Sequence, residues 1–181
     1  VDYTPAANFN GTEIITYTVS DGSLTDETGT LTITVTAVND APVAVADTKT
    51  VAEDAALTST DVIANDTDVE GDTLSLTAAT TAGTGTVAVN ADGLSVDYTP
   101  AANFNGTETI TYTVSDGTDT DATGTLTITV TAVNDAPVAT PQSVTTIEDK
   151  TLEIILSGTD LDEDALTYAL VDNPTNGTVS L

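Results

Sequence analysis

A seven-residue stretch occurs twice in this chain and divides it into repeats. Val38–Ala44 reads VNDAPVA, and the same letters return at Val133–Ala139, 95 positions later. The similarity extends backwards, because between Val1 and Ala44 only positions 14, 23, 24 and 27 differ from their counterparts. Proline fixes its own φ and keeps the preceding residue extended, while Asn and Asp favour turns. The chain is therefore predicted to be a tandem array joined by stiff connectors.

The spacing of the connectors predicts three units. Residues 1–40 are the C-terminal part of a repeat, residues 41–135 are one complete repeat, and residues 136–181 are the N-terminal part of a third. We name them the first, middle and third units. The chain opens within a strand pattern and without a signal peptide, so we interpret it as a segment of a longer protein.

The composition excludes several classes of function. The chain has 29 acidic residues and only two basic ones, which gives a net charge of -27. A protein with this charge is not expected to bind nucleic acid or an anionic membrane surface, and no stretch is apolar enough for membrane insertion. Cys, His, Met and Trp are absent, so no thiol or imidazole can serve as ligand or nucleophile. Any bound metal is expected to be a hard cation held by oxygen atoms.

Alternation of apolar residues with threonine predicts β-strands. Glu13–Val19 and Gly29–Thr36 show this period of two and are expected to pair antiparallel, as are their copies in the middle unit. Five more strands are predicted before that copy: Val43–Val51, Ala55–Thr60, Thr73–Ala78, Thr84–Asn90 and Leu94–Thr99. No helical period persists. Seven short strands in about a hundred residues are typical of an all-β, immunoglobulin-like sandwich.

The core of the complete repeat is predicted to consist of the apolar residues that alternate with threonine and face inward along these strands. Its members are Val51, Leu57, Leu74, Leu76, Val87, Val89, Val96, Tyr98, Ile110, Tyr112, Val114, Leu126, Ile128 and Val130. A core of this size can hold a domain of this length without disulfides or a metal.

Acidic residues gather in the loops at the ends of the predicted sandwiches. The densest run is 65–72, and 160–164 is its counterpart in the third unit. Close carboxylates repel one another by about 4 kcal/mol per pair at an effective dielectric near 20. Calcium, which takes six to eight oxygen ligands, would offset this repulsion, whereas a solvated acidic turn is the alternative interpretation. An EF-hand is excluded because Thr77 stands where that motif requires Glu.

The connector, the acidic loop and one strand end together resemble a known family. Val133–Pro137, Asp68–Asp72 and Tyr112–Gly117 resemble the linker, the paired-acid loop and the strand-end Asp motif of cadherin repeats. With the 95-residue period, they resemble the cadherin-like tandem repeats of large bacterial surface adhesins and biofilm proteins. The resemblance implies tandem sandwiches at the extracellular cell surface, with calcium as the cofactor at each junction.

The resemblance also implies which residues bind calcium. At the first junction the implied ligands are Asn39, Asp40, Asp66, Asp68, either Glu70 or Asp72, and Asp116. At the second junction they are Glu53, Asn134, Asp135, Asp160 and Asp162.

The function expected from these features is that of a calcium-stiffened spacer in a bacterial surface adhesin, contributing to cell adhesion or biofilm. Its partners would be adjacent repeats, with surface glycans or matrix bound through other domains. A calcium-dependent carbohydrate-binding module is the alternative. A hydrolase with paired carboxylates is disfavoured and no catalytic residue is assigned, because these acids repeat with the fold and form no unique constellation.

Overall fold

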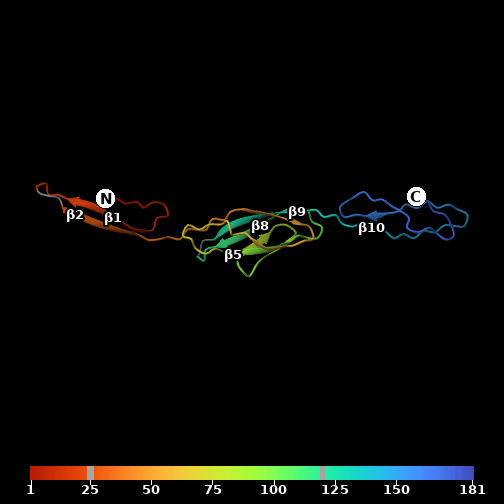
Figure 1. Ribbon diagram of the computed structural model, residues 1–181, viewed down its shortest axis with the longest axis horizontal. Coiled ribbons are helices and arrows are strands. Elements are labelled where there is room, and N and C mark those ends of the chain that lie inside the picture. The colour runs from red at the N-terminus through yellow and green to blue at the C-terminus, as the bar shows by residue number, and fades with distance from the viewer. Residues whose placement is uncertain (24–26, 119–120) are drawn as a thin grey trace.

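The computed structural model describes residues 1–23, 27–118 and 121–181, and these consist of strands, turns and loops. Figure 1 shows the units in a row, with the middle unit between the other two. The described residues contain no helix, so none of them forms a helix that could cross a membrane. The expected all-β class is confirmed.

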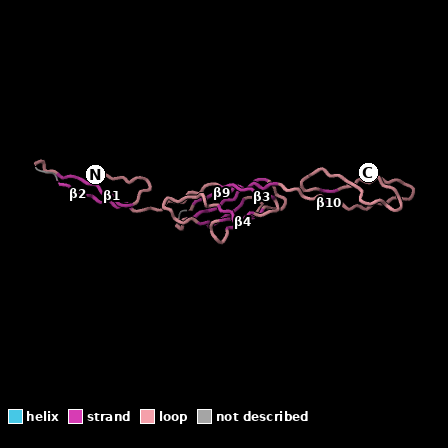
Figure 2. Tube along the Cα trace, viewed as in Figure 1, coloured by secondary structure: helices cyan, strands magenta, loops and turns pink. Residues whose placement is uncertain are grey.

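The middle unit folds into two sheets (Figure 2), which contain the seven expected strands. The four-stranded sheet has the order β3-β9-β8-β5, and the three-stranded sheet has the order β4-β7-β6. Their bounds are β3 Asp47–Ala52, β4 Leu57–Asp61, β5 Ser75–Thr81, β6 Thr86–Val89, β7 Ser95–Thr99, β8 Gly106–Ser115 and β9 Ala122–Thr131. Strand β3 runs parallel to β9, whereas the other pairs are antiparallel.

The first of these strands starts later than predicted. Residues from Val43 were expected to belong to it, but the strand begins at Asp47. Val43 instead pairs with Thr67 as an isolated antiparallel bridge, and the N–H of Val45 donates to Asp66. Because their backbone groups bond to the acidic loop, these residues hold that loop beside the entry to the sandwich.

The core follows from the predicted alternation. Ten of the predicted residues are buried, and the remaining four, Leu57, Leu74, Val87 and Val89, are partly buried against them. Threonines occupy the opposite face, where β-branched side chains suit a strand and stay soluble. Val62 and Ile63 are also buried, although they follow β4 in a turn where the period of two no longer applies.

The first and third units contain fewer strands. In the first unit β1 (Gly11–Val19) pairs antiparallel with β2 (Glu27–Val35), in the same arrangement as β8 and β9. In the third unit, β10 (Val138–Ala139) pairs with β11 (Gly158–Thr159).

Candidate cation-binding junctions

The connector between the first and middle units is attached to the end of β8 through Asn39. The Asn39 amide nitrogen donates to Asp116 Oδ2 at 2.8 Å and to Thr118 Oγ1 at 2.8 Å. Asp116 Oδ1 accepts from the N–H of Thr118 at 2.8 Å and from its hydroxyl at 2.7 Å. The hydrogen bonds from Asn39 and then Thr118 lower the pKa of Asp116 below its ordinary value. Two predicted ligands of this junction, Asn39 and Asp116, therefore lie in direct contact.

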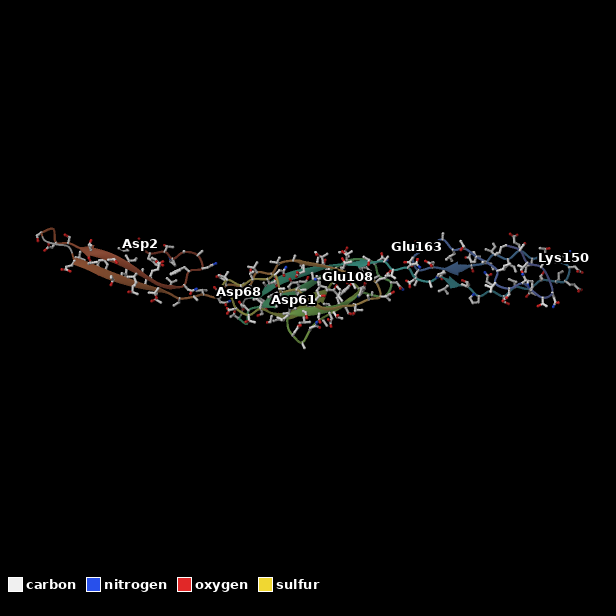
Figure 3. The ribbon with its side chains drawn as sticks, viewed as in Figure 1. Asp2, Asp61, Asp68, Glu108, Lys150 and Glu163 are labelled. Atoms are coloured by element: carbon white, nitrogen blue, oxygen red, sulfur yellow. The ribbon has the colours of Figure 1, made fainter. Side chains whose placement is uncertain are left out.

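The acidic loop contacts the same connector through Asp40. The N–H of Asp40 donates to Glu70 Oε2 at 3.1 Å, and the N–H of Asp72 donates to Asp68 Oδ1 at 3.0 Å. Asp68 Oδ2 is buried and has no hydrogen-bond donor among the described residues. Figure 3 shows Asp68 at the end of the middle unit that faces the first unit. A buried carboxylate oxygen without a donor is a group that a cation would satisfy.

Asp66 points into the middle unit instead of toward the connector. Its Oδ1 accepts from the N–H of Val45 at 2.7 Å, and its Oδ2 is buried without a donor among the described residues. Burial raises the pKa of Asp66, and the charges of Asp47 and Asp61 raise it further, although the Val45 N–H opposes them. Asp66 thus belongs to an acidic group with Asp47 and Asp61, two residues that the sequence did not single out.

The second junction repeats one contact of the first, the hydrogen bond from the connector aspartate to the acidic loop of the next unit. The N–H of Val133 donates to Glu53 Oε1 at 2.6 Å, and the N–H of Asp135 donates to Asp162 Oδ2 at 2.6 Å. The Asn134 amide nitrogen donates to the Asp135 carbonyl at 2.8 Å. The middle unit, the connector and the third unit therefore meet here, as the resemblance implied.

Asp160 organises the loop of the third unit. Its Oδ1 accepts from the N–H of Asp162 at 3.0 Å and from the N–H of Asp164 at 3.2 Å. The bond to Asp164 repeats the one between Asp68 and Asp72, four residues apart in both loops. Gly71 and Glu163 both take a positive φ, 77° and 60°. The two loops therefore share one conformation, in which Asp162 occupies the place of Glu70.

Asp135 lies where several negative charges converge. Burial raises its pKa, and the charges of Asp162, Asp54, Glu53 and Asp160 raise it further. The charged form of Asp135 is thus less favourable than that of an isolated aspartate. A cation bound at this junction would reverse that effect, because a nearby positive charge favours a carboxylate.

A hollow lies at each junction, built from equivalent positions. At the second junction it encloses about 350 Å³, and it is lined by Glu53, Asn103, Asn105, Ala132, Asp135, Leu161, Asp162 and Glu163. At the first junction it encloses about 280 Å³, and its polar lining is Asn8, Asn10, Thr36, Asp40 and Glu70. Each hollow therefore combines two asparagines of one unit, the aspartate of the connector and the acidic loop of the next unit.

Asn103 also has a turn role. Its φ is 55°, and its N–H donates to Asp54 Oδ1 at 3.2 Å. Asn103 therefore forms a turn and also lines the hollow of the second junction. Among residues 1–23, 27–118 and 121–181, no three acidic side chains already form a group that could hold a metal ion.

Glu108 is a buried carboxylate that the sequence analysis missed. It is 5% exposed, and it accepts hydrogen bonds from the N–H groups of Thr84 at 2.6 Å and Gly85 at 3.2 Å. The Tyr98 hydroxyl donates to its Oε2 at 3.0 Å. The signal was present in the sequence, since Glu108 has the same strand phase as Ile110 and Tyr112. Its role is structural, because it ties the loop before β6 to the core; Figure 3 shows it within the middle unit.

The comparison with protein families gives one match that covers nearly the whole chain. The model described as bacterial Ig domain matches residues 1–34, 39–129 and 134–181. The chain belongs to the bacterial Ig domain family. These matches begin and end close to the two connectors. Bacterial Ig domains are typically extracellular and surface-associated.

Solved structures similar to this bacterial Ig domain chain include an endo-fucoidan hydrolase, MfFcnA4 from glycoside hydrolase family 107, and a variant of it. Each is 27% identical with a TM-score of 0.41, over 71% of this chain and 20% of the hydrolase. A second endo-fucoidan hydrolase of that family, MfFcnA9, is 17% identical with a TM-score of 0.32. This match covers 70% of the present chain and 23% of the hydrolase. The chain thus spans about a fifth of the length of these hydrolases. The search of curated proteins gave no match.

Proposed function

We propose that this chain is a spacer of a bacterial surface adhesin, whose junctions bind calcium and thereby become stiff. The observation that carries the proposal is the pair of equivalent hollows. In each, a connector aspartate lies between the asparagines of one unit and the acidic loop of the next. An ion held there would connect three segments at once, so it would fix the orientation of two units. Binding of host or matrix would belong to other domains, and this chain would have no catalytic role.

The residues at the junctions suit calcium chemically. Their potential ligands are carboxylate and amide oxygens, which a hard cation prefers. Asp68 Oδ2 is buried without a donor among the described residues, and Asp135 has a raised pKa beside other carboxylates. At the first junction Asp40 and Glu70, which line the hollow, would contribute. Asp68, Asp72 and Asp116 lie outside its lining and would contribute from the acidic loop and the end of β8, together with Asn39 if its amide oxygen turns toward the ion. At the second junction Glu53, Asp135 and Asp162, which line the hollow, would contribute. Asn134 and Asp160 lie outside its lining and would contribute from the connector and the acidic loop.

The carbohydrate-binding alternative has little support in the middle unit. Stacking on a sugar ring requires an exposed aromatic face. Tyr98 and Tyr112 are each 1% exposed, and Phe104 is partly buried against the core. We therefore favour the spacer.

Calcium binding is testable by calorimetry on the 181-residue chain. With a Kd of about 10⁻⁴ M, one millimolar calcium is expected to stabilise the folded form by about 1.4 kcal/mol per site, so the melting temperature rises.

Asp135→Ala is expected to weaken calcium binding at the second junction and leave the middle unit folded, because the residue lies outside its core. Asp2→Ala removes the same charge from an exposed residue of the first unit and serves as the control. Equal melting temperatures in chelator and in calcium would exclude this function.

The spacer role itself is testable by small-angle scattering. Like charges at facing unit ends repel, so without a cation the connector has no attraction that selects one angle. At fixed ionic strength, calcium is expected to lengthen the maximum dimension of the chain and narrow its distance distribution. Dilute samples exclude self-association as the cause of a longer maximum dimension. A control with magnesium shows whether any divalent cation has the same effect by screening the negative charges. Identical profiles in calcium and chelator would show that the ion does not stiffen the junctions, even if it binds.

A further inference from the structure

An asparagine followed by a glycine lies at each junction. The two pairs are Asn10–Gly11 and Asn105–Gly106, at the same position of two repeats, and each asparagine lines the hollow of its junction. Asn105 belongs to the middle unit, in which all seven strands are present, so its surroundings within that unit are those of a whole sandwich. The hollow in front of it has an equivalent at the first junction, where the unit that follows the connector is the complete one.

The fold requires the glycine of this pair and not the asparagine. Gly106 opens β8 with a φ of 137°, a conformation that a residue with a Cβ rarely adopts. The φ of Asn105 is not positive, whereas Asn103 takes 55° in the preceding turn. Asn105 is exposed, and its carboxamide has no hydrogen-bond partner among the described residues. Its side chain is therefore free to rotate toward its own backbone.

An unrestrained asparagine that precedes glycine can react with the backbone. The Gly106 nitrogen loses its proton and attacks Cγ of Asn105, and the side-chain nitrogen leaves as ammonia. Water then opens the cyclic imide at either of its carbonyl groups, which gives aspartate or isoaspartate. One water is consumed, one ammonia is released, and nothing is oxidised or reduced. Glycine permits the attack because it has no side chain to hinder the approach.

Two other asparagines of the middle unit are restrained where Asn105 is not. Asn90 Nδ2 donates to Ser95 Oγ at 2.9 Å and to Asp97 Oδ1 at 3.0 Å, so its carboxamide is held in place. Asn103 precedes Phe104, whose N–H already donates to a carbonyl within the turn at 3.1 Å. Neither asparagine is therefore expected to react at a comparable rate.

The reaction changes the charge of the hollow at the second junction. The lining already contains the carboxylates of Glu53, Asp135, Asp162 and Glu163. Glu53 is only 3% exposed, and its Oε1 accepts from the N–H of the connector at 2.6 Å. A further carboxylate at position 105 increases the repulsion in the hollow when it is empty, and it provides another charged oxygen ligand when a cation is bound.

We propose that Asn105 is a site of spontaneous deamidation, and that the aspartate formed there strengthens cation binding at the second junction. The first part rests on the restraints around Asn105 and its neighbours, and the second part rests on the calcium function proposed above. The junction thus gains negative charge with age, although the sequence encodes a neutral amide. The isoaspartate product instead inserts a methylene group into the backbone just before β8.

Peptide mapping by mass spectrometry tests the modification on the 181-residue chain in chelator. The chain and a synthetic peptide with the sequence of residues 102–109 are incubated in parallel at physiological temperature, at neutral and at mildly alkaline pH. Asn105 is expected to deamidate in the folded chain, and faster at the higher pH because the Gly106 nitrogen must lose its proton. Asn90 and Asn103 are expected to stay intact.

Asn105→Gln is the matched control for the chemistry. It keeps the amide but would have to close a larger ring, so it is expected to remain unmodified. The modification is excluded if Asn105 in the folded chain is intact when the peptide has reacted to completion. It is also excluded as a selective site if Asn90 or Asn103 reacts as fast as Asn105.

Calorimetry on Asn105→Asp tests the consequence for cation binding. The calcium affinity of one site is expected to rise about tenfold, because the number of charged ligands tunes calcium affinity. Thr111→Asp adds the same charge at an exposed position in the middle of β8 and is expected to leave the affinity within about twofold of wild type, since salt screens a charge outside the hollow. Unchanged affinity in Asn105→Asp, with calcium bound by wild type, overturns the second part of the proposal alone. Absence of calcium binding by wild type overturns the calcium function and this second part together, whereas the peptide map still decides the modification.

Discussion

Gly124→Val is expected to unfold the middle unit at ambient temperature or leave it barely stable. A Cβ at this position would overlap the ring of Tyr112, which is 1% exposed and surrounded by the core. The Tyr112 hydroxyl lies 3.0 Å from Asp47 Oδ2 and 3.2 Å from the Val45 carbonyl, so its far end is fixed as well. Overpacking of a core costs about 3 kcal/mol, and more where the neighbouring atoms cannot move, which is a large part of the stability of a small domain. Urea unfolding followed by near-ultraviolet circular dichroism measures the change.

The first unit supplies a matched control for this prediction. Gly29 is the repeat counterpart of Gly124, and a Cβ there would lie 2.5 Å from the ring of Tyr17. Tyr17 is 49% exposed and can move away. Gly29→Val is therefore expected to change the unfolding of the middle unit by no more than about 0.5 kcal/mol. A wild-type midpoint for Gly124→Val would mean that Tyr112 is not held as tightly as its contacts indicate.

The strands and the core were predictable because both depend on local alternation. Strand β8 carries its buried residues at every second position, and so does β9. The parallel contact between β3 and β9 was not predicted, since it joins residues about 80 positions apart and leaves no local pattern. Burial itself also depends on distant segments: Val19 and Val114 have the same sequence neighbours and opposite exposure.

The junction contacts were predictable in part. The resemblance to cadherin repeats indicated that the connector contacts the acidic loop. The hydrogen bonds of Asp40 to Glu70 and of Asp135 to Asp162 agree with that expectation. Calcium binding itself stays a prediction. The orientation of Asp66 toward Asp47 and Asp61 was not predictable, because alternate carboxylates in a loop can turn to either side. The burial of Glu108 was not predicted, because a glutamate is ordinarily exposed to solvent even when it follows the inward-facing alternation of a strand.

Glu108→Ala is expected to destabilise the middle unit by about 3 kcal/mol, since it leaves the N–H groups of Thr84 and Gly85 and the Tyr98 hydroxyl without their acceptor. The glycines on either side of Thr84 make the contact possible. A Cβ on Gly83 would overlap the Glu108 carboxylate, and one on Gly85 would lie 2.6 Å from the Tyr98 ring. Burial together with the Glu108 hydrogen bond raises the pKa of Tyr98 to about 12, so the tyrosine remains a donor at physiological pH. Thermal unfolding in calcium-free buffer measures the loss.

The pH dependence of Glu108 separates its charge from its packing. Burial alone would raise its pKa, but hydrogen bonds from Thr84, Gly85 and Tyr98 outweigh burial and lower it. A lowered carboxyl pKa contributes stability that is present above the ordinary glutamate value of about 4.3 and is lost as the pH falls through the folded value. The difference in unfolding free energy between wild type and Glu108→Gln is therefore expected to be largest near neutral pH and to shrink in acid. Glu13→Gln, the same change at the exposed counterpart in the first unit, is expected to leave the middle unit unaffected at every pH. A constant difference between wild type and Glu108→Gln across the acid range would show that the carboxylate charge contributes nothing and that shape alone matters at this site.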